Sequence, residues 1–107
     1  MAEQIPGSRD IAIAVNDSLS VTGDSSVRIG RNSSSTVRDN QTVSVGKNIV
    51  VQAGDTLELV CGDARISMKK DGTIVIKGKD ITIEGRGKIS VKASSDVVLK
   101  GSKITQN

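Results

Sequence analysis

Apolar residues recur along the chain in pairs whose two members are separated by one residue. A spacing of two places both members on the same face of a β-strand, so each pair predicts a short strand with one buried face. The pairs are Ile11/Ile13, Leu19/Val21, Val27/Ile29, Val43/Val45, Ile49/Val51, Leu57/Leu59, Ile66/Met68, Ile74/Ile76, Ile81/Ile83, Ile89/Val91 and Val97/Leu99. Val37 stands alone, because Ser35 occupies the place of its partner. Successive pairs are mostly eight residues apart, with one step of six, one of nine and one of seven, and a further step of seven leads from Val97 to Ile104.

Glycine, asparagine and aspartate cluster between the pairs. These residues tolerate positive φ, so each repeat predicts a strand of about five residues and a turn of about three. The predicted turns are Asn16-Asp17, Gly23-Asp24, Gly30-Arg31-Asn32, Asp39-Asn40, Gly46-Lys47-Asn48, Gly54-Asp55, Gly62-Asp63, Asp71-Gly72, Gly78-Lys79-Asp80 and Gly85-Arg86-Gly87. No segment has helical periodicity. The sequence therefore predicts an all-β fold of eight-residue repeats, here called octads, with no helix.

One octad is too short to close a coil of a β-solenoid by itself. A coil formed by one chain requires roughly 18 residues or more, even in compact solenoids. Either one chain uses two or three octads per coil, or three chains wind together and each contributes one octad. If one chain formed each coil from two or three octads, these octads should differ from one another in a pattern that repeats every two or three. The sequence shows no such pattern. The second arrangement is favoured: an intertwined triple-stranded β-helix, a triangular prism formed by a homotrimer, in which each strand pairs with strands of the other two chains.

The apolar pairs would fill the axis of this prism. The chain has no Phe, Tyr or Trp, which fits a thin prism with little room for a ring at its centre. A 107-residue chain that relied on Ile, Val and Leu alone would also have a marginal core as a monomer. The predicted trimer core comprises Val43, Val45, Ile49, Val51, Leu57, Leu59, Cys61, Ile66, Met68, Ile74, Ile76, Ile81, Ile83, Ile89, Val91, Val97 and Leu99.

The chain is expected to divide into a short leader and a shaft. Residues 1–8, MAEQIPGS, read as an added leader, and residues 9–107 as a trimeric β-helix shaft that ends in a blunt C-terminal tip. The start lacks the basic and apolar regions of a signal peptide, and no stretch reaches the roughly 18 apolar residues of a membrane span. The single cysteine, Cys61, cannot form an intrachain disulfide and is expected to be a buried thiol.

Charge is distributed unevenly along the chain. Residues 1–63 carry five Lys or Arg and eight Asp or Glu, whereas residues 64–107 carry ten and four. A basic half is compatible with a nucleic-acid surface. However, its basic residues are spread over successive turns and strand centres, and no aromatic side chain is present for a base to stack on. No nucleic-acid partner is expected.

Catalytic chemistry has little support in the composition. The chain has no histidine, which removes the commonest general base and metal ligand. Two carboxylates could act as in glycosidases, but residues such as Asp55 and Asp80 fall in predicted turns, and Glu58 and Glu84 fall on outward strand faces. Calcium binding through Gly-Asp turns is an alternative, although the acidic residues do not recur at a fixed octad position. We expect no enzymatic activity, no cofactor and no metal site.

Several octads have the form V-x-G, namely Val21-Thr22-Gly23, Ile76-Lys77-Gly78, Ile83-Glu84-Gly85 and Leu99-Lys100-Gly101. Together with the segments VGKNIVVQAGDTLELVCG, KKDGTIVIKGKDITIEG and SSDVVLKGSKITQN, they closely resemble the C-terminal β-helix of VgrG proteins, the trimeric spikes of bacterial type VI secretion systems. The chain is similar, more distantly, to the needles of contractile phage tails. The resemblance covers residues 9–107.

This resemblance implies a structural, membrane-puncturing spike. Such a rigid homotrimer is mounted on the tail tube and is driven through the target-cell envelope by sheath contraction, carrying a PAAR-repeat tip protein and effectors. It would assemble on the tail tube in the bacterial cytoplasm and then be secreted or injected into the target cell. The tube-docking regions of a complete spike have no counterpart in this sequence.

The C-terminal residues are the expected docking platform. At the end of a three-chain prism the last strands have N–H and C=O groups with no further strand to pair with. By resemblance, a PAAR-repeat protein would complete these strands. The expected partner-binding residues are Ile104, Thr105, Gln106 and Asn107.

Two alternatives remain open. A contractile-phage baseplate spike would use the same fold. A single-chain β-solenoid that binds a ligand or a surface belongs to a different class, and a monomer mass in solution would favour it over the needle.

The assigned facing of the octads predicts opposite effects of two neighbouring substitutions. Ile76→Asp or Ile83→Asp would place three carboxylates close together in an apolar prism, at a cost of several kcal/mol for each chain. We expect loss of the trimer or failure to fold, measured by light scattering and circular dichroism. Thr82→Asp, on the outward face, should be tolerated, and equal damage from both changes would refute the assigned facing.

Overall fold

The structure, a computed structural model, describes residues 4–107; residues 1–3 of the predicted leader lie outside the described part. Residue contacts divide the chain into two units, residues 1–44 and residues 45–107. The described residues of the first unit contain no helix or strand, and those of the second contain one sheet and no helix. The described residues thus form strands and no helix, as predicted for an all-β chain, but only three of the eleven apolar pairs lie in strands: Leu57/Leu59, Ile66/Met68 and Ile74/Ile76.

The backbone bends at regular eight-residue intervals. Bends occur at residues 6–7, 14–15, 22–23, 30–31, 38–39, 46–47, 54–55, 86–87, 94–95 and 102. Two turns of the sheet and the bend at residues 79–80 lie within one residue of this interval. Six of these ten bends overlap predicted turns, and five of the six contain glycine, which lacks the Cβ that restricts a sharp change of direction. The predicted turn at Asn16-Asp17 is an exception, since the backbone bends earlier, at Ala14 and Val15.

The six-residue step from Val43 to Ile49 does not shorten an octad. The bends on either side of these pairs remain eight residues apart. Val43 lies five residues after the start of its bend, whereas Ile49 lies three residues after the start of the next. The apolar pair has therefore moved by two residues within the octad. A shift of two keeps the side chains on the same strand face.

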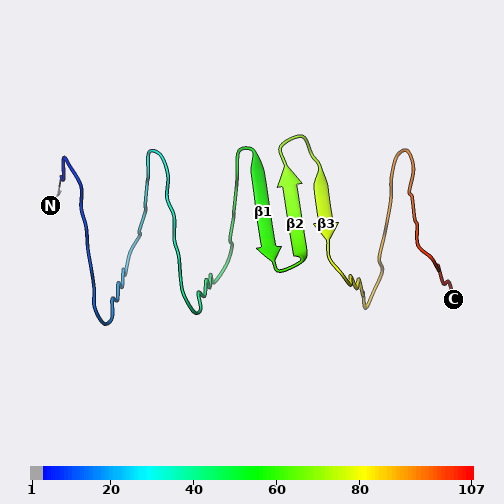
Figure 1. Ribbon diagram of the computed structural model, residues 1–107, viewed down its shortest axis with the longest axis horizontal. Coiled ribbons are helices and arrows are strands. Elements are labelled where there is room, and N and C mark those ends of the chain that lie inside the picture. Colours follow the sequence, from blue (N-terminus) through cyan, green and yellow to red (C-terminus); the bar gives the residue numbers. More distant parts are fainter. Residues whose placement is uncertain (1–3) are drawn as a thin grey trace. The chain divides into compact units, whose positions relative to one another are not determined.

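The sheet is an antiparallel meander of three strands in the order β1-β2-β3 (Figure 1). Strand β1 runs over Thr56–Cys61, β2 over Ala64–Lys69 and β3 over Ile74–Lys77. The register pairs Leu59 with Ile66, and Ile66 with Ile76. The octad pairs of three successive strands are thus brought side by side.

Two tight turns connect the strands, as their glycines predicted. Cys61 pairs with Ala64, so Gly62 and Asp63 form a two-residue hairpin turn, in which Gly62 has φ 54°. Glycine with positive φ at the first central position is the pattern of a type II′ turn, whose twist matches that of the strands.

The second turn is longer and is closed by three hydrogen bonds. The Gly72 N–H donates to the Lys69 carbonyl at 3.0 Å, and the Lys69 N–H donates to the Thr73 carbonyl at 3.0 Å. Gly72 has φ 94°, which fits a three-residue hairpin loop with glycine in its last position. The Thr73 N–H also donates to Oδ1 of Asp71 at 3.1 Å, and this bond lowers the pKa of the Asp71 carboxyl.

Pairing within one chain corrects one expectation. We predicted that each strand pairs with strands of the other two chains, and this is wrong for β2, because β1 and β3 occupy both of its edges. The reason is the length of the connections. A two-residue turn allows only an antiparallel reversal, whereas a parallel strand requires a crossover of a dozen or more residues.

Outside this meander the described residues do not pair their backbone groups with one another. Among residues 4–107, backbone hydrogen bonds lie between Asp55 and Lys77. The chain exposes 12,199 Å², about twice the roughly 5,700 Å² expected for a compact monomer of 11.2 kDa. The described residues contain no buried apolar side chain. One chain therefore lacks both a core and most of the hydrogen bonds of a folded protein.

The hairpin turn at Gly62 predicts a position-specific effect of alanine. Gly62→Ala places a Cβ in the left-handed region and should cost about 1–2 kcal/mol for each chain. Gly54→Ala is the matched control, because Gly54 has an ordinary φ and nothing lies within 4 Å of the position that a Cβ would take there. The free energy of unfolding measured in urea should fall for Gly62→Ala and change little for Gly54→Ala; equal values would show that the turn does not form.

Candidate assembly interface

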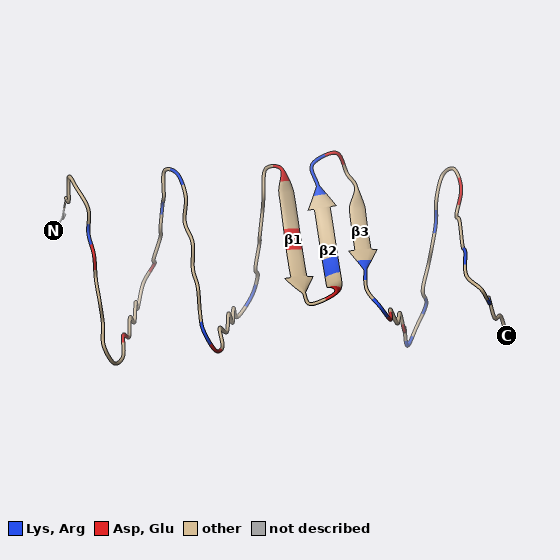
Figure 2. Cartoon of the chain, in the orientation of Figure 1, with Lys and Arg blue, Asp and Glu red and all other residues tan. Residues whose placement is uncertain are grey.

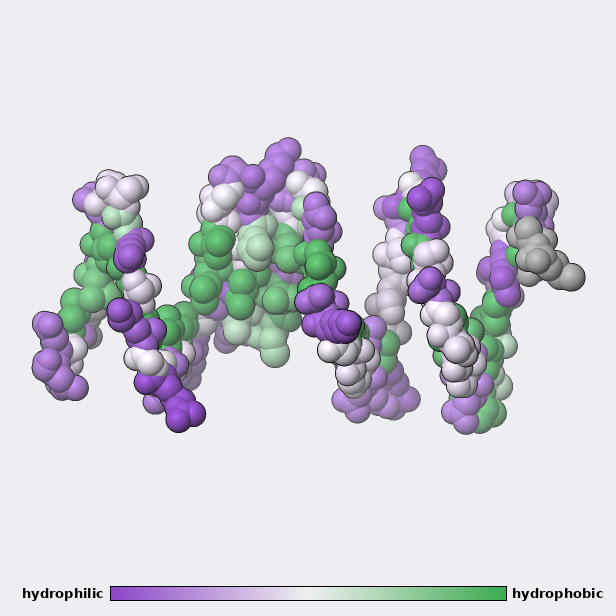
Figure 3. Space-filling view, turned by 180° about the vertical axis from the view of Figure 1, so that it is seen from behind, coloured by the Kyte–Doolittle hydropathy of each residue, from purple (hydrophilic) through white to green (hydrophobic). Residues whose placement is uncertain are grey.

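One face of the meander carries mostly apolar side chains and is here called the apolar face. Two rows cross the three strands on it: Leu57, Met68 and Ile74 are opposite one another in one row, and Leu59, Ile66 and Ile76 in the other. Residues directly opposite on one face have Cβ atoms about 4.5–5.5 Å apart, close enough for the side chains to pack together. Apolar side chains gather over this sheet in the space-filling view (Figure 3).

The opposite face is mostly polar. Its rows are Glu58, Ser67 and Val75, and Val60, Arg65 and Lys77. Ser67, at the centre of β2, is buried, with 7% of its surface exposed, because the larger side chains on both neighbouring strands flank it. Val60 and Val75 were not assigned a role from the sequence, since they interrupt the polar side of the alternation. The contrast between the two faces shows which one needs a covering partner.

The apolar face is uncovered in the single chain. Leu59 is 63% exposed and Ile76 is 61% exposed, and Ile66 of the central strand is still 42% exposed. Three strands with a hydrophobic face are about the smallest sheet that is stable by itself, and removing that face from water provides its main stabilisation. A contiguous exposed apolar surface rimmed by polar residues is typical of a protein–protein interface. The apolar face is therefore the candidate assembly interface.

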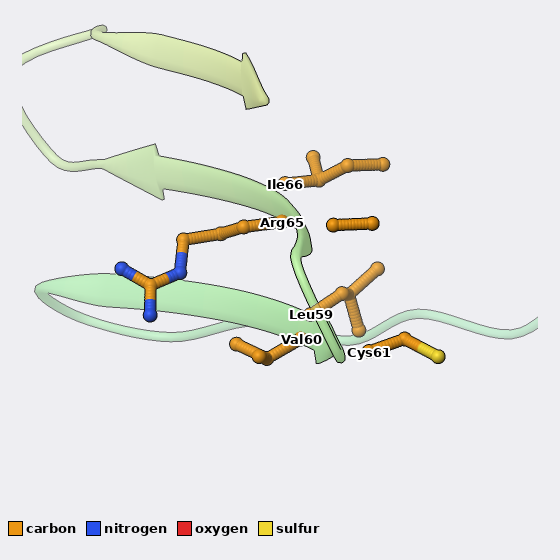
Figure 4. A pocket seen from close by; sticks show the side chains of 6 residues that line it. Leu59, Val60, Cys61, Arg65 and Ile66 are labelled. Atoms are coloured by element: carbon orange, nitrogen blue, oxygen red, sulfur yellow. The ribbon is translucent and has the colours of Figure 1, made fainter. Parts of the chain in front are cut away.

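Cys61 lies at the hairpin end of the apolar face. It is a free, exposed thiol beside a shallow hollow of about 270 Å³ lined by Leu59, Val60, Cys61, Ala64, Arg65 and Ile66. Figure 4 shows Leu59, Cys61 and Ile66 on one side of the sheet and the Arg65 side chain extending to the other. The hollow is open and has apolar walls. It presents a mostly apolar surface against which a neighbouring side chain could pack.

The sheet brings together part of the predicted trimer core. Seven predicted core residues share the apolar face: Leu57, Leu59, Cys61, Ile66, Met68, Ile74 and Ile76. The other ten lie outside the sheet and are exposed: Val43, Val45, Ile49, Val51, Ile81, Ile83, Ile89, Val91, Val97 and Leu99. One chain does not assemble these ten into a core, and their packing in a trimer stays a prediction.

Two of the four V-x-G glycines, Gly78 and Gly85, lie against an isoleucine of the next octad. A Cβ at Gly85 would lie 2.8 Å from Cγ1 of Ile89, and a Cβ at Gly78 would lie 3.5 Å from Cγ1 of Ile81. The first distance is too short for a real contact, so an alanine at residue 85 would displace Ile89. The bend at residues 86–87 thus folds an apolar side chain back over the glycine that precedes it.

The predicted tip residues lie apart from any strand. Ile104 is exposed, as are Thr105, Gln106 and Asn107. Their backbone groups form no hydrogen bond within the described chain. The structure therefore leaves these groups available to a partner, and their role as a docking platform stays a prediction.

The polar side chains of residues 4–107 are the candidates for a metal site and for ion pairs. Among residues 4–107, no three His, Cys, Asp or Glu side chains are placed to share a metal ion. The described residues form two surface ion pairs, Lys70 with Asp55 at 3.4 Å and Arg38 with Asp39 at 3.9 Å. Exposed pairs of this kind stabilise a protein by about 1 kcal/mol at most. Across the same residues, no helix meets the length and hydrophobicity that crossing a membrane would require.

Comparison with known proteins identifies a relative. No protein-family model matches the sequence. Over 57 residues, or 53% of this chain, the sequence is 68% identical to the type VI secretion system spike protein VgrG1b of Pseudomonas aeruginosa. The chain spans 8% of the length of that relative. The predicted resemblance to VgrG proteins is confirmed over these 57 residues.

The position of Cys61 predicts its reactivity. In a trimer that buries the apolar face, three Cys61 thiols would lie near the axis, shielded from solvent, whereas in a single chain the thiol is exposed. We expect a thiol reagent to label Cys61 only after the protein is unfolded. Absorbance and mass spectrometry would measure the labelling. Rapid labelling of the native protein would contradict burial of this face.

Proposed function

We propose that this chain, which is related to VgrG spike proteins over 57 of its residues, forms the shaft of a type VI secretion spike. Three copies would wind into a rigid needle with a structural role in puncturing membranes. The observation that carries the proposal is the uncovered apolar surface of the single chain: every described Ile and Val is at least 42% exposed. Three identical chains would cover those of these residues that lie on the apolar face, whereas Val60 and Val75 of the polar face would stay exposed.

The meander gives the needle a section in which each chain pairs with itself. The apolar face of each meander would point to the axis, and three such faces would close a prism. The free edges of β1 and β3 would remain for strands of neighbouring chains. Elsewhere, octads of different chains would pair with one another and satisfy backbone groups that the single chain leaves without partners.

A needle of this kind suits mechanical work. Interchain hydrogen bonds would run along its length, so separating the chains would require many of them to break together. The spike would assemble on the tail tube in the bacterial cytoplasm, pass through a target-cell envelope and carry effectors. These roles come to this chain from its relation to VgrG.

The C-terminal residues would hold a PAAR-repeat tip protein. Ile104 would be covered by that protein, and the backbone of residues 104–107 would pair with its strands. Support comes from the exposure of these residues and from their backbone groups, which have no partner within the described chain.

Deletion of residues 102–107 tests the proposed tip. The remaining octads are untouched, so we expect the truncated chain to keep the mass of a trimer in light scattering. It should lose binding to its cognate PAAR protein by at least about tenfold in calorimetry, because both the apolar contact and the strand pairing are removed. Undiminished affinity would place the platform elsewhere on the needle.

A further inference from the structure

The C-terminal part of the chain carries a positive charge that its own carboxylates do not neutralise. Residues 64–107 contain ten basic and four acidic residues, and all ten basic residues are exposed. In the described chain only Lys70 among these ten lies within 4 Å of a carboxylate, that of Asp55. Basic residues stand near both ends of β2 and at the end of β3 (Figure 2). This part, here called the basic half, has a net charge of +6, since ten positive charges face four negative ones.

The basic side chains lie away from the apolar face. Arg65 and Lys77 are opposite each other on the polar face of the meander. Lys92 and Lys100 directly follow the apolar residues Val91 and Leu99, and alternation along an extended segment places successive side chains on opposite sides. A trimer that buries the apolar pairs would therefore keep these charges on its outside.

We propose that the basic half is a binding surface for the phosphate groups of anionic lipid membranes. This inference rests on the proposed trimer, in which three copies would triple the net charge of the basic half. Exposed Lys and Arg side chains are attracted to anionic leaflets, and the attraction grows with each basic residue that reaches the surface, even when these residues are spread along a shaft. Residues 1–63 contain five basic and eight acidic residues, so this part of the chain would not be attracted to anionic membranes.

The arrangement fits a membrane better than a nucleic acid. Threefold symmetry repeats every basic residue on all three sides of the shaft. A duplex contacts one side of a protein, whereas lipid headgroups would surround a shaft that passes between them. Eight of the ten basic residues are lysines, which act as point charges toward phosphate. The chain also has no aromatic side chain on which a base could stack.

Vesicle sedimentation tests the inference with the full chain. Vesicles of mixed phosphatidylglycerol and phosphatidylcholine should bind the protein at low salt, and vesicles of phosphatidylcholine alone should not. Binding should weaken strongly at about 0.5 M salt, because salt screens charges on a solvent-exposed surface. Binding that is equal for both lipid compositions, or insensitive to salt, would overturn the proposal.

Charge reversal locates the surface. The double variant Lys92→Glu with Lys100→Glu changes two positions in every chain of a trimer and should weaken binding to the anionic vesicles by about tenfold or more. The matched control, Arg31→Glu with Lys47→Glu, reverses two exposed charges in the N-terminal part and should leave binding nearly unchanged. Equal losses in the two variants, or binding to duplex DNA in the absence of vesicle binding, would contradict the proposal.

The mass of the protein separates this inference from the proposed function. Both variants should keep the wild-type mass in light scattering, because all four residues are exposed. If the protein is a trimer and does not bind anionic vesicles, only the proposal of a membrane-binding surface is wrong. A monomer would overturn the proposed needle and, with it, the inference that depends on it.

Discussion

The main constraint on this chain is the pairing of its own backbone. N–H and C=O groups in folded proteins require partners, and an octad has too few residues to return and pair with itself. The meander at residues 55–77 solves the problem locally with two tight turns. The other octads have no such turn. Their backbone groups therefore require hydrogen-bond partners from outside the chain, and their Ile and Val side chains require a surface that covers them. Three parallel copies of the same chain would provide both.

Much of the local structure could be predicted from the sequence. The spacing of two identified residues that share a strand face, and the register of Leu59, Ile66 and Ile76 agrees with it. Glycine predicted the turns at Gly62 and Gly72, where φ is positive. These features are predictable because they depend on neighbouring residues and on the absence of a Cβ.

Pairing between segments was harder to predict. The nine-residue step between Leu57 and Ile66 looked like an irregularity of the repeat, but it accompanies a hairpin in which β2 runs back along β1. The six-residue step after Val43 proved to be a shift within an octad of constant length. Periodicity alone does not specify which strand lies beside which. For the same reason, the packing of the predicted core outside the sheet and the role of residues 104–107 depend on contacts between chains, which a pattern within one chain does not contain.

Amide hydrogen exchange of the native protein tests the central claim most directly. If other chains supply the backbone partners that a single chain lacks, amides in residues 11–45 and 81–99 should exchange slowly, with protection comparable to that of β2. The claim would be contradicted if protection were confined to residues 56–77 and the other octads exchanged at the rate of an unstructured peptide.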